Sequence, residues 1–170
     1  AFITMLLERG ANIEARTKLG GTLLHVAASH NNLPVMAFLL KEKGFLVDCT
    51  DDGQGTPLYY ALSFGHEEAT RFLIEQGASV THRSVRGVTP LHVAAARGNL
   101  ANVTLLLSRG AQAHVATDQG VTPLHLTRSL AVAQALRPDR GARRHPAPPG
   151  LHPAHARPGG AGRVRDRRHA

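Results

Sequence analysis

The chain has 170 residues, of which 42% are hydrophobic and 4% aromatic, and it carries 20 lysines and arginines against 12 aspartates and glutamates. Its single cysteine, Cys49, excludes an internal disulfide framework and fits a reducing compartment, so we expect an intracellular protein, cytoplasmic or nuclear. The sequence has no apolar run near the roughly 18 residues of a membrane span, so we expect no membrane segment.

Two sequence markers recur along the chain at a fixed interval. Similar segments begin at Thr22, Thr56, Thr89 and Thr122, which are 34, 33 and 33 residues apart. A second marker keeps the same steps at Gly10, Gly44, Gly77 and Gly110. A period of this length indicates a stacked array of repeats.

Each repeat begins with signals for a short helix. The threonine is a favourable N-cap, and Pro57, Pro90 and Pro123 follow it at a position where a missing N–H costs nothing. Asn31, Gly65 and Gly98 stand nine residues after a threonine, where a residue in the left-handed conformation would end that helix.

A second helix is predicted to return after the first. In the third repeat an apolar stripe at helical spacing runs through Leu100, Val103, Leu106 and Leu107, and Gly110 follows it. The polar segments that come next, such as residues 116–120, predict turns of extended hairpins that link consecutive units.

The motif Thr-Pro-Leu-His-x-Ala over Thr89–Ala94, followed by an apolar run and Gly-Ala at a period near 33, resembles the ankyrin repeat family. The resemblance covers residues 1 to about 136. It implies an all-α helical repeat solenoid with β-hairpin or turn fingers. The motif residues are Thr22, His25, Thr56, Pro57, Thr89, Pro90, His92, Thr122, Pro123 and His125.

We expect three parts in the chain. Residues 1–16 form a partial repeat, and residues 17–136 form three full repeats and a truncated one, which is just enough for a stable array because about three repeats are needed. In the first full repeat one extra residue within Lys41–Gly44 is expected to be absorbed at the loop before the hairpin. In the second, Gln54 stands where other repeats have glycine, and we expect a mobile finger there.

Residues 137–170 differ sharply in composition from the repeats. They hold nine arginines against Asp139 and Asp166, so seven of the eight net positive charges lie in this segment. The segment is rich in Pro, Gly and Ala and has Leu151 and Val164 as its larger aliphatic residues, too few to offset the entropy of ordering it. We predict a disordered basic tail that could attract nucleic acid or acidic surfaces without specificity.

No pattern in the sequence predicts catalysis or a cofactor. The motif histidines His25, His92 and His125 recur once per repeat beside a capping threonine, which favours a structural role in the turn over a general base or metal ligand. Nucleophile elbows, phosphate loops and zinc-type spacings are absent from the sequence. We therefore expect no enzyme activity, no cofactor and no metal in this chain.

The surface that the repeats do not need for stacking is the expected binding site. In proteins resembling this family, partners lie against the hairpin tips and the exposed side of the first helices. Carried over residue by residue, that surface comprises Lys18, Leu19, His30, Asp52, Phe64, Val85, Arg86, Val88, Arg97, Asp118 and Gln119, with Ser29, Gly53, Ser63 and Val121 beside them. Leu19, Phe64 and Val88 are apolar, and Arg86 and Arg97 flank them, a combination that interface hot spots favour.

The sequence thus predicts a protein–protein interaction module that acts as a monomer and binds a protein partner of unknown identity. Two alternatives stay open. The chain could be the recognition arm of a larger enzyme, or it could bind nucleic acid through the basic tail alone.

Overall fold

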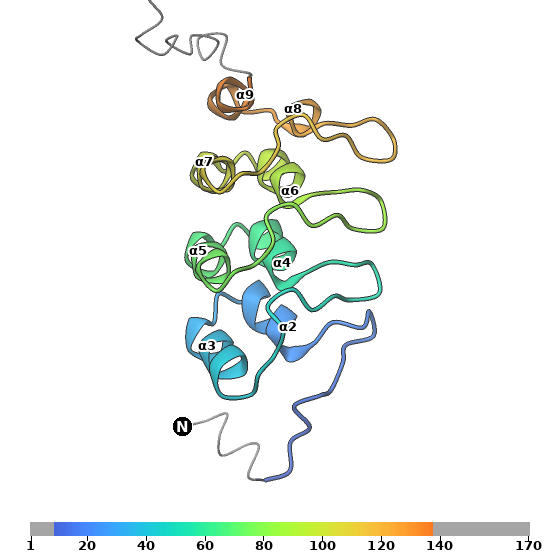
Figure 1. Cartoon of the computed structure of the whole chain (residues 1–170), viewed down its shortest axis with the longest axis vertical. Helices are drawn as coiled ribbons and strands as arrows, with labels where there is room; N and C mark the ends of the chain where they lie inside the picture. The colour runs from blue at the N-terminus through green and yellow to red at the C-terminus, as the bar shows by residue number, and fades with distance from the viewer. Residues whose placement is uncertain (1–8, 138–170) are drawn as a thin grey trace, which may run out of the picture. The chain divides into compact units, whose positions relative to one another are not determined.

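The computed structural model describes residues 9–137, and Figure 1 shows them as a stack of helix pairs. The predicted all-α repeat fold is confirmed: within the described range no residue lies in a β-strand, and the fingers are hairpin-shaped turns. The prediction of a disordered tail falls, apart from Arg137, outside the described residues, and so does the start of the predicted partial repeat.

Helices alternate between two layers of the stack. The first layer holds α2 (Leu23–Ser29), α4 (Pro57–Phe64), α6 (Pro90–Arg97) and α8 (Pro123–Leu126). The second layer holds α3 (Leu33–Lys41), α5 (Glu67–Glu75), α7 (Leu100–Ser108) and α9 (Leu130–Leu136). Each helix contacts the next one in its own layer, and the fingers project from the side of the first layer (Figure 1).

The first-layer helices begin and end where the repeat pattern predicts. The threonines that precede α2, α4, α6 and α8 have extended backbone and act as N-caps. After α4 and α6, Gly65 and Gly98 take the left-handed conformation, with φ of 77° and 70°. In the first repeat Asn31 does so with φ of 53°, and its side chain contacts the next repeat: Asn31 Oδ1 accepts from the Ala69 N–H at 3.0 Å.

The core runs between the layers and continues from repeat to repeat. Leu24, Leu58 and Leu91 occupy equivalent positions on the first-layer helices and are fully buried. Burying a leucine side chain contributes about 1.5–3 kcal/mol. Small residues on the same helices, including Ala61 and Ala94, are also fully buried, which lets neighbouring first-layer helices approach closely.

One part of the predicted apolar stripe on α7 is wrong. Leu100 is 43% exposed, and the buried face of the helix consists of Asn102, Val103 and Leu106. Leu100 is the first residue of α7, so it lies where the helix emerges from the turn rather than on the packed face.

The extra residue of the first repeat lies at the end of α3. There the Phe45 N–H donates to the carbonyl of Leu39, six residues back, whereas Ala78 and Ala111 donate to carbonyls five residues back in the second and third repeats. The insertion therefore lengthens the turn after α3 by one residue. The helix itself remains as long as α5 and α7, at nine residues.

Candidate functional site

Four hairpin turns, which we call fingers 1 to 4, span residues 17–21, 51–55, 84–88 and 117–121. In each finger the N–H of the first residue donates to the carbonyl of the last; Thr17 to Gly21 and Thr117 to Val121 are both 2.8 Å. The fourth residue has a positive φ in every finger, and it is Gln54 in finger 2 and glycine in the others. The repeats therefore build the same turn four times from different side chains.

Main-chain hydrogen bonds join each finger to the next. The Asp52 N–H donates to the Leu19 carbonyl at 3.0 Å, and the Val85 N–H donates to the Gly53 carbonyl at 3.2 Å. The third link runs from the Asp118 N–H to the Arg86 carbonyl, also at 3.2 Å. The four tips are thus held as one row by bonds that involve no side chain.

Two of the motif histidines connect a repeat to the finger that follows it. Nδ1 of His25 accepts from the Thr22 N–H at 3.0 Å, and Nδ1 of His92 accepts from the Thr89 N–H at 3.1 Å. Because a backbone N–H can only donate, each Nδ1 is unprotonated in the neutral ring and Nε2 carries the proton. Nε2 of His25 then donates to the Gly55 carbonyl at 3.0 Å, and Nε2 of His92 donates to the Val121 carbonyl at 2.9 Å.

The third motif histidine lies in the last repeat and differs from these two. His125 makes the same bond with the Thr122 N–H at 3.0 Å, but its ring is exposed. In the second repeat Tyr59 takes the histidine position, and the neighbouring Tyr60 hydroxyl donates instead to Asp51 Oδ2 at 2.6 Å. Burial, helped by Asp51, raises the pKa of Tyr60 to about 12.

The electrostatics of these groups are unsuited to acid–base or nucleophilic chemistry. Desolvation lowers the pKa of both His25 and His92. In each ring both nitrogens are already hydrogen-bonded to backbone groups. Burial raises the pKa of the Cys49 thiol, which lies 3.4 Å from Thr22 Oγ1 and 3.9 Å from His25 Nδ1. A reactive cysteine needs the opposite shift.

The structure places most of the predicted partner-binding residues at the surface of the finger tips. Leu19 and Val85 are 67% and 60% exposed. The other exposed tip residues from the predicted set are Lys18, Asp52, Gly53, Arg86, Asp118 and Gln119. Val88 is the exception: it is half-buried, because it lies at the base of finger 3, where its carbonyl accepts from the Ser84 N–H. Val121 occupies the same place in finger 4 and is also half-buried.

The remaining predicted residues lie where the first-layer helices end. His30, Phe64 and Arg97 stand eight residues after their threonines and are all exposed, Phe64 by 58%. The Phe64 ring stacks on His66 with a centroid distance of 6.2 Å, and His66 Nε2 bonds to the Ser29 carbonyl at 2.9 Å. Ser29 and Ser63 are half-buried. The structure therefore presents an aromatic ring beside the end of the preceding repeat's first helix.

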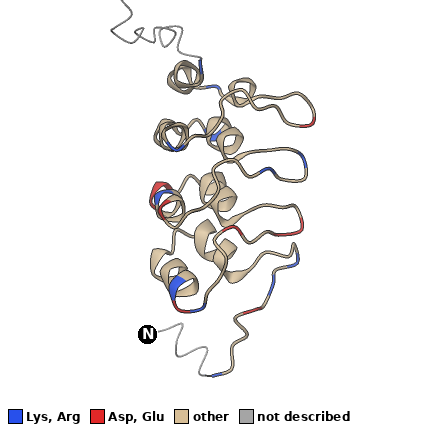
Figure 2. Cartoon of the chain, viewed as in Figure 1, with Lys and Arg blue, Asp and Glu red and all other residues tan. Residues whose placement is uncertain are grey.

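Two residues that fix the positions of the fingers were not among the site residues predicted from the sequence. Asp51 Oδ1 accepts from the N–H groups of Gly53 and Gly55, at 2.9 and 2.7 Å, and so fixes finger 2. Arg83 donates to the Ala116 carbonyl at 3.0 Å and lies 3.5 Å from Asp118, which ties finger 3 to finger 4. The Arg83 contact has no local signal in the sequence, because it joins groups 33 residues apart. Each finger has charges of one sign at its tip, and the sign alternates along the row (Figure 2).

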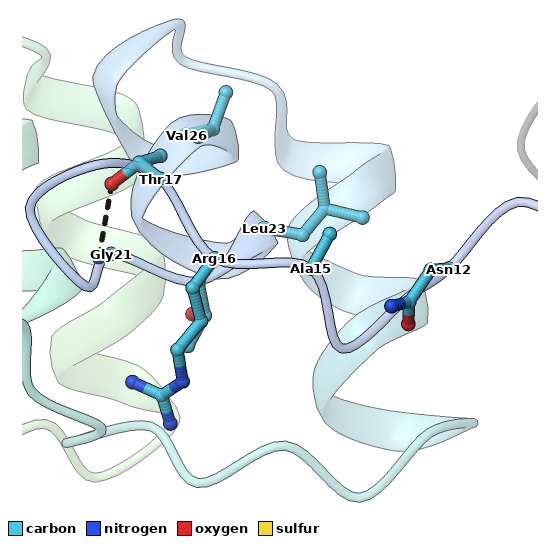
Figure 3. A pocket seen from close by; sticks show the side chains of 8 residues that line it. Asn12, Ala15, Arg16, Thr17, Gly21, Leu23 and Val26 are labelled. Atoms are coloured by element: carbon cyan, nitrogen blue, oxygen red, sulfur yellow. Dashed lines mark hydrogen bonds between the residues drawn. The ribbon is translucent and has the colours of Figure 1, made fainter.

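Two pockets in the described region are small. One of about 230 Å³ lies where residues 12–17 pass α2, lined by Ala15, Arg16, Leu23 and Val26 among others (Figure 3). A second, of about 250 Å³, is lined by Val80, Arg83, Thr89 and Val115 and neighbours. Both fall below the roughly 300–1,000 Å³ of typical small-molecule sites. The row of tips and helix ends is a better candidate for binding than either pocket.

Metal-binding clusters and membrane-spanning helices are both absent from the described part of the chain. Between residues 9 and 137, no three His, Cys, Asp or Glu side chains are grouped to hold a metal ion. None of the helices in that region could span a bilayer.

Short helix pairs stacked at a constant step, with a row of turns along one side, define a helical repeat solenoid that displays a continuous surface. Residues 1–84 match the sequence profile of ankyrin repeats in three copies, and residues 64–107 match a second profile of ankyrin repeats in many copies. The chain belongs to the ankyrin repeat family. Repeats of this family are generally protein–protein interaction modules, and ankyrin repeat domains are generally non-catalytic.

Three relatives illustrate where such repeats occur. The chain is 44% identical over 71 residues to the poly(ADP-ribose) polymerase tankyrase of Caenorhabditis elegans and 34% identical over 82 residues to delta-latroinsectotoxin-Lt1a of Latrodectus tredecimguttatus. It is 41% identical over 58 residues to a putative ankyrin repeat protein of fowlpox virus (strain NVSL). These matches cover 40%, 48% and 34% of this chain but only 3%, 7% and 30% of the relatives.

Proposed function

We propose that this chain is a protein-binding module that holds a protein partner across the finger tips and the exposed ends of the first-layer helices. One observation carries the proposal: side chains that the stack does not need, Phe64 and Arg97, are exposed at equivalent places on α4 and α6. Helices packed side by side lie about 10 Å apart, so one partner can touch both residues.

The exposed side chains are of the kinds that interfaces favour. Phe64 supplies a large apolar surface held by stacking on His66, and Arg97 can form forked hydrogen bonds to a carboxylate. Leu19 and Val85 add aliphatic surface on the finger tips. Together they form a mixed apolar and charged surface at the finger tips and along one edge of the first layer.

We propose no catalytic role for the repeats themselves. The neutral, doubly bonded histidines and the thiol with a raised pKa support this reading. The poly(ADP-ribose) polymerase tankyrase shares with this chain only a segment equal to 3% of its own length, and that segment covers repeats alone.

The double variant Phe64→Ala with Arg97→Glu tests the proposal. It should abolish capture of the protein partner in a pull-down with the whole chain, while the circular-dichroism spectrum stays unchanged because both side chains are exposed. The matched control is Leu46→Ala with Arg71→Glu, which changes an exposed aliphatic residue and an exposed arginine outside the proposed surface. The control should capture the partner normally.

Removal of residues 138–170 is the second arm of this test. If the tail only attracts acidic partners, its loss should slow association and reduce the dependence on salt, with little change in dissociation. Normal capture by the double variant together with complete loss on tail removal would contradict the proposal, because binding would then reside in the arginine-rich segment.

A further inference from the structure

The exposed charges at the finger tips alternate in sign from one repeat to the next. We call Lys18, Asp52, Arg86 and Asp118 the tip charges; they belong to fingers 1, 2, 3 and 4 in that order. Figure 2 shows the pattern as blue, red, blue and red along the row of fingers. All four residues are exposed.

The fold uses little of this charge. In the described residues the one ion pair within 4 Å joins Arg83 to Asp118 at 3.5 Å, and the Asp118 side chain is still 62% exposed. Lys18, Asp52 and Arg86 form no ion pair within residues 9–137. By contrast, Asp51 is hydrogen-bonded within finger 2, and Arg83 is hydrogen-bonded to the Ala116 carbonyl just before finger 4. The tip charges are therefore available to a partner.

The spacing of the row selects one backbone conformation for a bound segment. Neighbouring repeats are offset by about 10 Å, the usual distance between packed helices. A β-strand covers that distance in about three residues, but every third side chain of a strand points to the opposite face. A polyproline II helix has three residues per turn and rises about 3.1 Å per residue, so every third side chain returns to the same face after about 9 Å.

The main-chain links between the fingers hold the row in place before a partner arrives. Because the tips are joined at 3.0–3.2 Å by backbone bonds alone, little order has to be created at the tips on binding. The exposed Leu19 and Val85 lie on the two basic fingers, so those fingers offer an aliphatic contact beside a positive charge.

Building on the proposed function, we infer that the finger tips bind a polyproline II segment of the protein partner whose charged residues alternate in sign at every third position. Its acidic residues face Lys18 and Arg86, and its basic residues face Asp52 and Asp118. The exposed end of the first layer, with Phe64 and Arg97, then contacts another part of the same partner.

Two synthetic peptides of identical composition test this inference. Both are proline-rich and carry a charged residue at every third position; one orders its charges acid, base, acid, base, and the other acid, acid, base, base. Fluorescence anisotropy with the full chain at low ionic strength should show the alternating peptide bound about tenfold more tightly, since two favourable ion pairs replace two unfavourable ones. Attraction to the basic tail is the same for both peptides and cancels in the comparison.

A charge-swap variant makes the test specific to the row. Asp52→Lys with Arg86→Glu changes the order along the tips to plus, plus, minus, minus, so the preference should switch to the blocked peptide by a similar factor. Lys18→Glu with Asp118→Lys produces the reverse order, minus, minus, plus, plus, so it should prefer a third peptide of the same composition, ordered base, base, acid, acid, over the alternating one. This second variant keeps the test usable if the first folds poorly. Circular dichroism verifies folding in each case.

The outcomes separate this inference from the proposed function. Equal binding of both peptides by the wild-type chain, binding of neither, or an unchanged preference in both variants would overturn the inference. If the variants lost thermal stability and showed no change in peptide preference, the alternating charges would stabilise contacts between fingers and would not bind a partner. Loss of partner capture by Phe64→Ala with Arg97→Glu would in that case leave the proposed function standing.

Discussion

Gly87 is required in finger 3 for two reasons, only one of which concerns its backbone. Its φ is 72°, in the left-handed region that side chains disfavour. In addition, a Cβ at this position would lie 2.6 Å from Asp118 Oδ1 and 2.5 Å from Arg83 Nη2. Gly120 holds the same place in finger 4, with φ of 76°, but a Cβ there would have no atom within 4 Å.

This difference predicts unequal costs for the same substitution. Gly120→Ala should lower the free energy of unfolding by about 1 kcal/mol, the cost of the left-handed backbone. Gly87→Ala should cost about 2 kcal/mol or more, because Asp118 and Arg83 must also move. Urea unfolding of the two variants measures the difference, and equal midpoints would show that the contact between fingers 3 and 4 contributes nothing.

Finger 2 shows how a departure from the pattern is accommodated. Gln54 takes the glycine position with φ of 57°. Asp52 of finger 2 and Asp118 of finger 4 approach the glycines of the fingers before them, Gly20 and Gly87. The residue at the corresponding place in finger 3 is Val85, not aspartate. Asp51 fixes the turn through the N–H groups of Gly53 and Gly55. The mobility expected for this finger stays a prediction.

At the scale of the elements, the histidine bridges make the contact between repeats sensitive to pH. Desolvation lowers the pKa of His25 and His92 below the ordinary value of about 6.5, so the folded state favours the neutral ring. A protonated Nδ1 could no longer accept from the threonine N–H. The stability that these rings contribute is therefore complete above about pH 6.5 and is lost as the pH falls below it.

We predict that the melting temperature of the wild-type chain falls between about pH 7 and about pH 5. In the variant His25→Gln with His92→Gln it should be lower at the higher pH and should change less with pH, because the titrating bridges are gone. His114→Gln is the control, since His114 is exposed, unlike His25 and His92. A double variant whose melting temperature changed with pH as steeply as the wild type would show that other groups cause the effect.

At the scale of the whole array, burial of the second residue of a first-layer helix depends on whether another repeat follows it. Leu91 is fully buried on α6, whereas Leu124, its equivalent on α8, is 42% exposed. The last repeat is also short: α8 has four residues where α4 and α6 have eight. Arg128 follows α8 and is exposed, as a residue in a terminal repeat can be.

Matched leucine variants measure this gradient. Leu91→Ala should cost about 2–5 kcal/mol of unfolding free energy, enough to unfold much of a short array. Leu124→Ala should cost about 1 kcal/mol or less, because its side chain is already partly in water. Comparable losses in denaturant unfolding would indicate that the outer face of α8 is covered in solution.

The repeat period was sufficient to predict the architecture, because one motif occurs four times and each occurrence constrains the others. The positions of the caps at Thr56, Gly65 and Gly98 followed from helix chemistry alone. Exposure of Val88 and burial of Leu100 were mispredicted, because each depends on where a turn meets its neighbour and not on periodicity. The contact between Arg83 and finger 4 spans 33 residues and has no local signal.

The hydrogen bonds between fingers also determine which mutations the tips can tolerate. Since the donors are the main-chain N–H groups of residues 52, 85 and 118, any amino acid except proline can keep the link, as Asp and Val already do. The tips can therefore diverge in sequence while the junctions between repeats persist. A library randomised at residues 18, 19, 52, 53, 85, 86, 118 and 119, with proline withheld at the three donor positions, would alter the chemistry of the surface and retain its geometry.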